Sequence, residues 1–333
     1  MGSSPGHMLL GDIGATNARL ALLSNGVLGP IDSFTVAEFA RFADALDAFL
    51  ERRGRQVPVP EALLAVAGPV AGDRCVLTNC PWTIDAPELR AGFGFAKVNI
   101  FNDFEATARS LPQLMAADLY PLGGGAAVSG EPMAVLGPGT GLGVACLVPA
   151  SPNPVVIASE GGHATMAGSS PREDAIIDHL RRELGHVSAE RVVSGLGLEN
   201  LHRAVVALDG ADAPQRNAAA ITKAGLDGSC PIARETLELF CAMLGTIAGN
   251  AALMFGARGG VYIAGGIAPR IKEFLARSEF RTRFEGKGRL GPYLASIPTR
   301  VIVHPAATFL GLRAIAGRTA DAASGAHPDC VRS

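Results

Sequence analysis

Two stretches of the chain share a strand–turn–strand pattern built on a glycine-rich turn, and this repeat constrains the fold more than any other feature. The first is LLGDIGATNARLALL (residues 9–23), and the second is VLGPGTGLGVACLV (residues 135–148). Matched on Thr16 and Thr140, the two stretches place apolar residues at the same positions of their second strands. Repeated units indicate repeated structure, so the pattern predicts one hairpin in each half of the chain. Chance similarity between two glycine-rich turns is the alternative.

Strands alternate with helices along the rest of the chain. Residues 38–53 carry apolar side chains at helical spacing, and residues 62–70 form a continuous apolar run that ends in Gly-Pro. Residues 97–111 pass from a strand into a helix near Asn102. We expect further helices at 169–184 and 236–256, a strand at 299–305 and a final short helix at 309–317, followed by an irregular tail from Arg318. This alternation predicts an α/β architecture.

Composition excludes several classes of protein. A chain of 333 residues allows one large or two ordinary domains. Its net charge of −2 and the lack of a basic stripe argue against a nucleic-acid partner, and no polybasic run suggests a membrane surface. The six cysteines are scattered without a Cys-x-x-Cys pair, which favours reduced thiols in a cytoplasmic protein. We interpret residues 1–7 as a remnant of an expression tag.

One apolar segment, residues 239–257, is about as long as a membrane span. Asn250 and several glycines interrupt it, and a strand-like run, GGVYIAGGI, follows at once. We therefore predict a buried core helix that leads into a buried strand.

Asp12 is an acid at the end of an apolar strand, beside a turn whose N–H groups could face a phosphate. Two unit charges 4 Å apart interact by roughly 4 kcal/mol at an effective dielectric of about 20, so a carboxylate near phosphates needs a cation between them. Mg²⁺ binds oxygen ligands and phosphates and keeps several waters, which would suit Asp12. The alternative is an ordinary turn aspartate that caps Gly14 or Thr16.

Asp103, in FNDFEATA, also has two interpretations. It could be the N-cap of the helix that starts there, or a general base at the carboxyl edge of a sheet, with Asn102 beside it to hold a hydroxyl. Glu160 and His163 flank a Gly-Gly pair and could converge on a ligand or lie in a surface turn.

Two more motifs remain open at this point. Ser188 could cap a helix that carries Glu190 in its first turn. Gly265 and Gly266 could let an adenine lie against the backbone, or could form an ordinary strand-to-helix turn.

Taken together, the motifs resemble those of a known family. GDIGATNARLAL, LTNCPWTID, FNDFEATA, LGPGTGLGVACLV, SEGGHATM, HVSAERVVSG, GGVYIAGGIAPR and TRVIVHP occur in the order found in bacterial ATP-dependent glucokinases, which are hexokinase-like sugar kinases. The resemblance runs from Met8 to about Gly317. It implies a two-domain α/β fold of the actin-like ATPase (ribonuclease H-like) type, with a cleft between a small and a large domain. The small domain would comprise residues 8–113 and a C-terminal helix at about 304–320, and the large domain residues 114–303.

The resemblance also implies a role for each motif residue. The first phosphate loop would contain Gly11, Asp12, Ile13, Gly14, Ala15 and Thr16, with Asp12 near Mg²⁺ through water. The second would contain Gly139, Thr140 and Gly141, and the adenosine motif Gly265 and Gly266. Glucose would be bound by Asn102, Asp103, Glu160, His163 and Glu190, with Asp103 as the catalytic base.

The implied activity is transfer of the γ-phosphoryl group of ATP, with Mg²⁺, to the 6-hydroxyl of glucose, in a cytoplasmic homodimer that feeds glycolysis. Kinases for another hexose, a polyphosphate donor and a non-catalytic sugar sensor are the alternatives. Two departures from the pattern matter. Ala15 stands where the family usually has a second glycine, and no cysteine follows the Gly-Gly-His motif, which places the chain in the branch without zinc.

Overall fold

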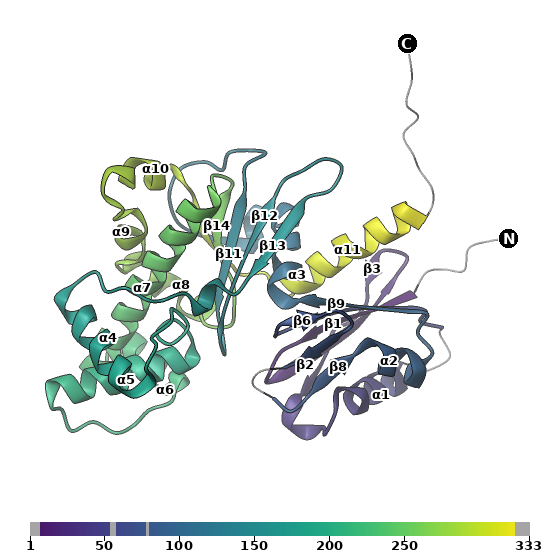
Figure 1. Ribbon diagram of the computed structural model, residues 1–333, viewed down its shortest axis with the longest axis horizontal. Helices are drawn as coiled ribbons and strands as arrows, with labels where there is room; N and C mark the ends of the chain where they lie inside the picture. The colour runs from purple at the N-terminus through teal and green to yellow at the C-terminus, as the bar shows by residue number, and fades with distance from the viewer. Residues whose placement is uncertain (1–6, 54–57, 78–79, 324–333) are drawn as a thin grey trace, which may run out of the picture. The chain divides into compact units, whose positions relative to one another are not determined.

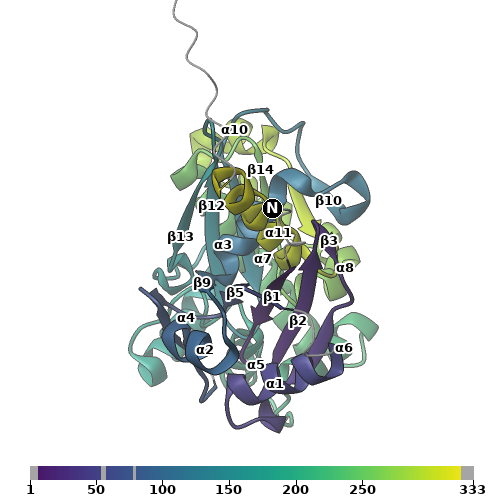
Figure 2. The ribbon, with the colours of Figure 1, turned by 90° about the vertical axis from the view of Figure 1, so that its right-hand side faces the viewer.

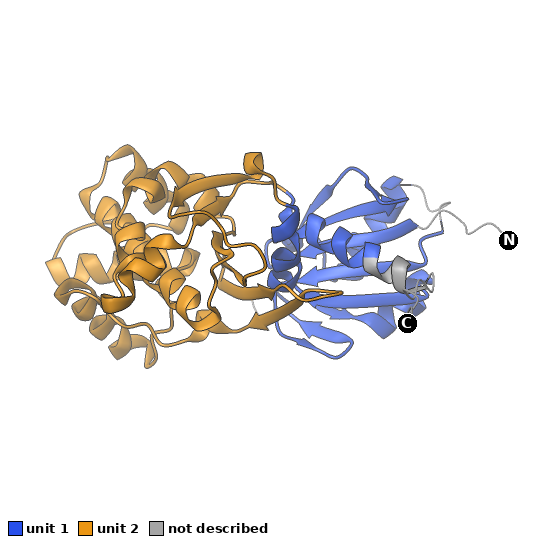
Figure 3. Cartoon of the chain, turned by 90° about the horizontal axis from the view of Figure 1, so that it is seen from above, with its two compact units in different colours: residues 1–113, 306–333 blue, residues 114–305 orange. Residues whose placement is uncertain are grey.

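The computed structural model describes residues 7–53, 58–77 and 80–323. The chain forms two compact units (Figure 3): unit 1 is Met1–Gln113 with Ala306–Ser333, and unit 2 is Leu114–Pro305. Most of the stretch interpreted as a tag remnant lies outside the described residues, as do Thr78 and Asn79 of LTNCPWTID and the last of the six cysteines, Cys330.

Unit 1 is built on a six-stranded sheet with the order β3-β2-β1-β5-β9, in which β4 also pairs with β2. Strands β1 and β2 form an antiparallel hairpin, whereas β5 runs parallel to β1 and β9 parallel to β5. These strands are β1 (His7–Ile13), β2 (Asn17–Ser24), β3 (Val27–Leu28), β4 (Asp32–Thr35), β5 (Glu61–Val66) and β9 (Lys97–Asn102). A small antiparallel sheet joins β6 (Val70–Ala71), β7 (Arg74–Val76) and β8 (Thr83–Asp85).

Helices cover both faces of this sheet (Figure 1). They are α1 (Phe42–Arg53), α2 (Ala86–Phe93), α3 (Asp103–Ser110) and α11 (Ala307–Ala323). Successive residues of a strand face opposite sides, so Leu9 packs with α1 and α2 while Leu10 packs with α3 and α11. Helices α3 and α11 lie side by side (Figure 2): a Cβ on Gly311 would be 1.7 Å from the carbonyl oxygen of Ala106.

Two helix boundaries in unit 1 differ from the sequence prediction. The helix expected at 38–53 begins only at Phe42, because Phe39 is extended and its carbonyl accepts the indole N–H of Trp82 (3.0 Å). The final helix is longer than expected, since α11 continues past Arg318 to Ala323.

The sheet of unit 2 repeats the topology of the first. Its order is β10-β15-β14-β11-β12-β13, and the segment β12-β11-β14-β15 matches β2-β1-β5-β9 in every strand direction. The strands are β10 (Leu119–Gly123), β11 (Met133–Pro138), β12 (Leu142–Val148), β13 (Val155–Ser159), β14 (Gly260–Ile263) and β15 (Thr299–Ile302). The predicted repeat of two hairpins is therefore confirmed, and it extends to the two parallel strands beside each hairpin.

Seven α-helices belong to the described part of unit 2: α4 (Pro171–Leu184), α5 (Gly195–Asp209), α6 (Ala218–Asp227), α7 (Pro231–Phe255), α8 (Lys272–Arg277), α9 (Phe280–Glu285) and α10 (Gly291–Ser296). By length and composition α7 could cross a membrane, but 72% of its most apolar window is buried inside the unit. The prediction of a core helix that leads into a buried strand is confirmed, because β14 follows α7 directly.

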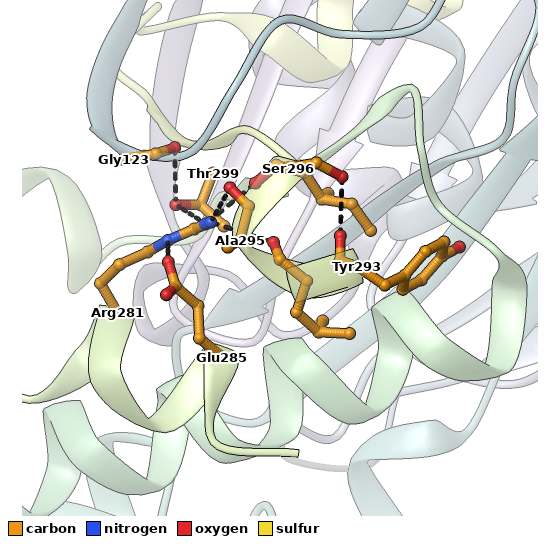
Figure 4. A network of polar contacts seen from close by, with 9 residues as sticks. Gly123, Arg281, Glu285, Tyr293, Ala295, Ser296 and Thr299 are labelled. Carbon is orange, nitrogen blue, oxygen red and sulfur yellow. Dashed lines mark hydrogen bonds and ion pairs between the residues drawn. The ribbon is translucent and has the colours of Figure 1, made fainter. Parts of the chain in front are cut away.

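Strand β10 is not among the strands predicted from the sequence, and it ends in the glycine-rich run that begins at Gly123. Arg281 of α9 organises this region (Figure 4): its guanidinium donates to the carbonyl oxygens of Leu294, Ala295 and Ile297 at 2.9–3.1 Å. It also donates to the hydroxyl of Thr299, which in turn donates to the carbonyl of Gly123 (3.3 Å). The edge strand is thus attached through contacts that lie far away in the sequence.

Candidate functional site

The first hairpin ends in a turn at residues 14–17, which we call turn 1. The Gly14 N–H donates to the carbonyl of Asn17 (3.0 Å), and the side chain of Thr16 is exposed. Gly11 and Ile13 lie within β1: a Cβ on Gly11 would be 2.7 Å from a methyl group of Leu64, and Ile13 is fully buried. These two residues shape the hairpin, and the groups that can face a phosphate come from turn 1 itself.

Ala15, the departure from the family pattern, fits turn 1 without strain. Asn25 is the one non-glycine residue with a positive φ in the described parts of the chain, so the backbone of Ala15 is in a region that L-residues adopt readily. The methyl group therefore carries no conformational cost.

The carboxylate of Asp12 is held by Arg19, a residue that sequence reasoning missed. Oδ2 of Asp12 accepts hydrogen bonds from Nε (3.1 Å) and Nη2 of Arg19, and the Asp12 side chain is 14% exposed. The turn-cap interpretation of Asp12 is wrong, because the N–H of Gly14 donates to Asn17 instead. The available signal was the hairpin register, which places Asp12 directly opposite Arg19.

The donor set around Asp12 fits a metal only together with a nucleotide. Within residues 7–53, 58–77 and 80–323, no group of three or more His, Cys, Asp or Glu could hold a metal ion. Mg²⁺ commonly takes one or two carboxylates and completes its coordination with phosphate oxygens and water. One carboxylate next to a turn whose N–H groups could face a phosphate would satisfy that requirement.

Asn102 and Asp103 lie where the parallel strand β9 passes into α3. The N-cap is Asn102, whose Oδ1 accepts from the backbone N–H of Phe104 (2.9 Å) and Glu105 (3.2 Å). The interpretation of Asp103 as the cap is therefore wrong. Asp103 is the first residue of α3, is half-buried, and accepts through Oδ1 from the N–H of Phe104 (2.9 Å). Its carboxylate is at the carboxyl edge of the sheet, where ligands of α/β proteins bind.

The charge of Asp103 contributes to a raised pKa at the buried thiol of Cys75. Burial first, then the charge of Asp103 and the thiol of Cys80, raise the pKa of Cys75. A Cβ on Gly68 would be 3.1 Å from Sγ of Cys75, and the carbonyl of Gly68 accepts from Nδ2 of Asn102 (3.4 Å). Cys75, Cys80, Cys146, Cys230 and Cys241 are free thiols.

In unit 2, the second hairpin ends in a tighter turn at residues 139–141, which we call turn 2. The Gly139 N–H donates to the carbonyl of Gly141 (2.8 Å), and the carbonyl of Gly139 accepts from the N–H of Gly195, the first residue of α5 (2.8 Å). Thr140 is exposed at the tip. Turn 2 is therefore attached to a helix N-terminus, which favours anions.

The structure brings Glu160, His163 and Glu190 together beside turn 2. Glu160 precedes a 3₁₀ helix, Gly161–His163, and its Oε2 is 3.9 Å from Nε2 of His163, with both side chains exposed. The backbone N–H of Glu190 donates to the carbonyl of Gly162 (2.8 Å), and its Oε2 accepts from the N–H of Leu142 (2.9 Å).

The helix-cap interpretation of Ser188 is wrong, and so is the placement of Glu190 in a first helical turn. Ser188 forms an isolated bridge with Thr165, and Glu190 lies in a turn. The cap of α5 is Ser194, whose Oγ accepts from the N–H of Gly197 (2.9 Å).

Gly265 and Gly266 follow β14, and each has a different reason to be glycine. Gly265 has φ +81°, and a Cβ there would be 2.4 Å from the carbonyl oxygen of Pro138. A Cβ on Gly266 would meet nothing within 4 Å, so its backbone borders open space.

A cavity of about 800 Å³ lies in unit 2 beside turn 2. Its wall includes turn 2, the start of α5, one face of α6 and the segment that follows Gly266: Gly139, Thr140, Gly195, Leu196, Leu198, Glu199, Ala218, Ala219, Thr222, Lys223, Leu226, Asp227, Ile267 and Arg270. Sequence reasoning found the turn and the glycines but not α6, whose contribution has no local signature.

Comparison with known proteins shows the family of the chain. A family model described as Glucokinase matches residues 9–319. The chain belongs to the glucokinase family. The glucokinase of Paramagnetospirillum magneticum is 48% identical over 308 residues, which cover 92% of this chain and 96% of the relative, and that of Nitrobacter hamburgensis is 43% identical over 304 residues, 91% and 95% of the two chains.

Among solved structures, a glucokinase from an Antarctic psychrotroph superposes with a TM-score of 0.81 at 34% identity, and the match covers 95% of this chain and 100% of that one. The fold is therefore the two-domain, actin-like fold of the sugar kinases, as the glucokinase resemblance implies.

Proposed function

We propose that the chain transfers the γ-phosphoryl group of ATP to the 6-hydroxyl of D-glucose, giving glucose 6-phosphate and ADP. Membership of the glucokinase family makes it an ATP-dependent hexose kinase. The observation that carries the proposal is the junction at Leu142, where Glu190 and the Gly-Gly-His segment meet the base of turn 2. Hydroxyl-binding groups and a phosphate-facing turn are thereby joined in one unit.

The cavity beside turn 2 supports a nucleoside triphosphate as the donor rather than polyphosphate. A polyphosphate chain needs a track of cations, whereas this wall contains two basic residues, Lys223 and Arg270, together with Glu199 and Asp227. Lys223 also forms an ion pair with Asp227 (3.0 Å). A volume of about 800 Å³ with mostly apolar walls suits a nucleoside, with its phosphates toward turn 2.

For the sugar, Asn102, Glu160, His163 and Glu190 would bind the hydroxyl groups that do not react. The exposed carboxylate of Glu160 and imidazole of His163 offer an acceptor and a donor within 3.9 Å of each other. A site that pairs hydroxyl groups rejects analogues that lack them, because its own polar groups are then left without partners.

Asp103 would accept the proton of the 6-hydroxyl as that oxygen attacks the γ-phosphorus. Its position at the start of α3 is fixed by the cap from Asn102, so little reorganisation is needed. The N–H groups of turns 1 and 2 would stabilise the phosphate oxygens. Mg²⁺ bound with ATP, held by Asp12 through water, would neutralise the phosphate charge.

The proposal extends to the setting of the enzyme: a cytoplasmic homodimer that feeds glycolysis, with glucose and ATP as its partners and neither nucleic acid nor membrane. The family resemblance supports the dimer and the pathway, and the net charge of −2 supports the lack of polyanionic partners.

A coupled assay for glucose 6-phosphate, run with Mg²⁺ and either ATP or polyphosphate, tests the proposal. We expect turnover with ATP and glucose, and much weaker turnover across a panel of other hexoses and N-acetylated sugars. A higher kcat/KM for another sugar would reassign the substrate, faster turnover with polyphosphate would reassign the donor, and no turnover with any pair would favour the sugar sensor.

A further inference from the structure

Glu190 makes more contacts than a sugar ligand requires. Its carboxylate accepts from the N–H of Leu142 (2.9 Å), the first residue after turn 2. Its backbone carbonyl accepts from Oγ of Ser194 (2.7 Å), the cap of α5. The next residue, Gly195, donates to the carbonyl of Gly139 in turn 2 (2.8 Å). Glu190 is thus connected to both ends of turn 2.

Turn 2 needs such support from outside the hairpin. The residue pair at its base is Pro138 and Leu142, and proline has no N–H to donate across the strands. The bonds from Glu190 to Leu142 and from Gly195 to Gly139 bring external partners to both sides of the turn.

Gly141 leaves room for the hydrogen bond between the carboxylate of Glu190 and the N–H of Leu142. A Cβ at this position would be 2.4 Å from Oε2 of Glu190, so a side chain here would displace the carboxylate from its place beside the N–H of Leu142. Gly141 does not have a positive φ, so its backbone conformation gives no separate reason for glycine. The Glu190 carboxylate and the glycine of turn 2 fit each other.

We propose that Glu190 is a positioning residue for turn 2, so that nucleotide affinity depends on the reach of its side chain even without sugar. This inference rests on the proposed function, which assigns the cavity beside turn 2 to the nucleotide. Oε2 holds the turn, while Oε1 accepts no hydrogen bond in the described part of the chain and is available to a sugar hydroxyl. One carboxylate thereby serves both substrates.

Isothermal titration calorimetry with MgADP, in the absence of glucose, tests the inference. A lost hydrogen bond to a charged group corresponds to roughly a tenfold change in affinity, so we expect Glu190→Ala to raise the Kd of MgADP about tenfold. Glu190→Gln keeps an acceptor at the same reach and should stay within about twofold of wild type. Glu190→Asp keeps the charge but is one methylene too short, and should resemble Glu190→Ala.

Glu160→Ala is the matched control, because Glu160 belongs to the same proposed sugar set but contacts His163 rather than turn 2. It should weaken glucose binding and leave the Kd of MgADP unchanged. If Glu190→Ala does not fold, the Kd values of MgADP for Glu190→Gln and Glu190→Asp decide. Only a positioning role predicts that the shorter, charged side chain of Glu190→Asp binds MgADP more weakly than Glu190→Gln does.

A double-mutant cycle with Gly141→Ala completes the test. The new methyl group should displace the carboxylate and raise the Kd of MgADP, and it should add little in a Glu190→Ala background. Wild-type MgADP affinity in both Glu190→Ala and Glu190→Asp would overturn this inference alone. Failure of the wild-type protein to bind MgADP would overturn the proposed donor site, and this inference with it.

Discussion

Arg19 and Asp12 face each other across the first hairpin, and the guanidinium binds the carboxylate through Nε and Nη2. The same guanidinium lies 5.7 Å from the ring centroid of Phe309 in α11. Arg19 is therefore fixed on both sides, and Asp12 presents its carboxylate in one orientation. A preorganised carboxylate costs less to align when a metal–nucleotide complex binds.

Loss of Arg19 should weaken use of MgATP. Arg19→Met removes two hydrogen bonds to Asp12 and leaves an unpaired negative charge near the proposed phosphate position. We expect the KM for MgATP to rise about tenfold, with little change in the KM for glucose. Arg19→Lys keeps the positive charge but lacks the forked donor geometry of a guanidinium, so its KM for MgATP should lie between those of wild type and Arg19→Met. Equal KM values for ATP in all three proteins would show that Asp12 needs no such support.

Asp103→Asn should abolish most of the turnover. General base catalysis contributes typically about 10²–10⁴-fold, and asparagine keeps the size of the side chain while it cannot accept the proton. We expect kcat to fall by at least about 10²-fold, with glucose binding still measurable by calorimetry. Glu105→Gln is the control, because Glu105 lies on the same helix and pairs with Arg109 (2.8 Å). A kcat close to wild type in Asp103→Asn would contradict the assignment of the base.

Ala15→Gly should restore the family pattern without improving catalysis. Because the backbone of Ala15 has no positive φ, glycine brings only additional freedom to the unfolded chain. We expect the free energy of unfolding to fall by about 0.4–1 kcal/mol and the KM for ATP to stay the same. Urea unfolding and steady-state kinetics measure both. A clear gain in ATP affinity would mean that the methyl group obstructs the phosphate.

Gly265→Ala and Gly266→Ala should separate two roles of the Gly-Gly motif. At Gly265, φ is +81° and a methyl group would meet the carbonyl of Pro138, so alanine should lower the midpoint of thermal unfolding. At Gly266 nothing lies within 4 Å, so alanine should leave that midpoint unchanged but raise the KM for ATP if adenine rests on this backbone. An unchanged KM for ATP in Gly266→Ala would mean that adenine binds elsewhere in the cavity.

Acid should destabilise the protein partly through His202. Burial first, then the charge of Arg216, lower the pKa of His202, and its Nε2 has no partner among the residues that the structure describes. Below a pH of about 6.5 the unfolded chain takes up a proton that the folded state binds less readily. The free energy of unfolding therefore decreases as the pH is lowered.

Urea unfolding at pH 7.5 and pH 5.5 measures this effect. His202→Gln should lose less stability between the two values than wild type does. His186→Gln changes an exposed side chain and should lose as much as wild type. Identical losses in wild type and His202→Gln would exclude His202 as the acid-sensitive group.

The features that sequence could predict are local ones. Both hairpins follow from apolar runs around glycine-rich turns, and β5, α4 and α7 follow from periodicity and length. The contact between Glu190 and Leu142 joins residues 48 positions apart, and no local pattern encodes it. The choice of Asn102 rather than Asp103 as the cap depends on a one-residue difference in where α3 begins, which two adjacent capping residues leave undecided.

The packing of α11 against α3 has a consequence for biosynthesis. The chain leaves unit 1 at Gln113 and returns to it only at Ala306, after all of unit 2. During synthesis on the ribosome, α11 emerges after all of unit 2. Until then it cannot pack against the face of the sheet that carries Leu10 or against α3. Unit 1, which begins to be translated first, is therefore the unit whose core is completed last.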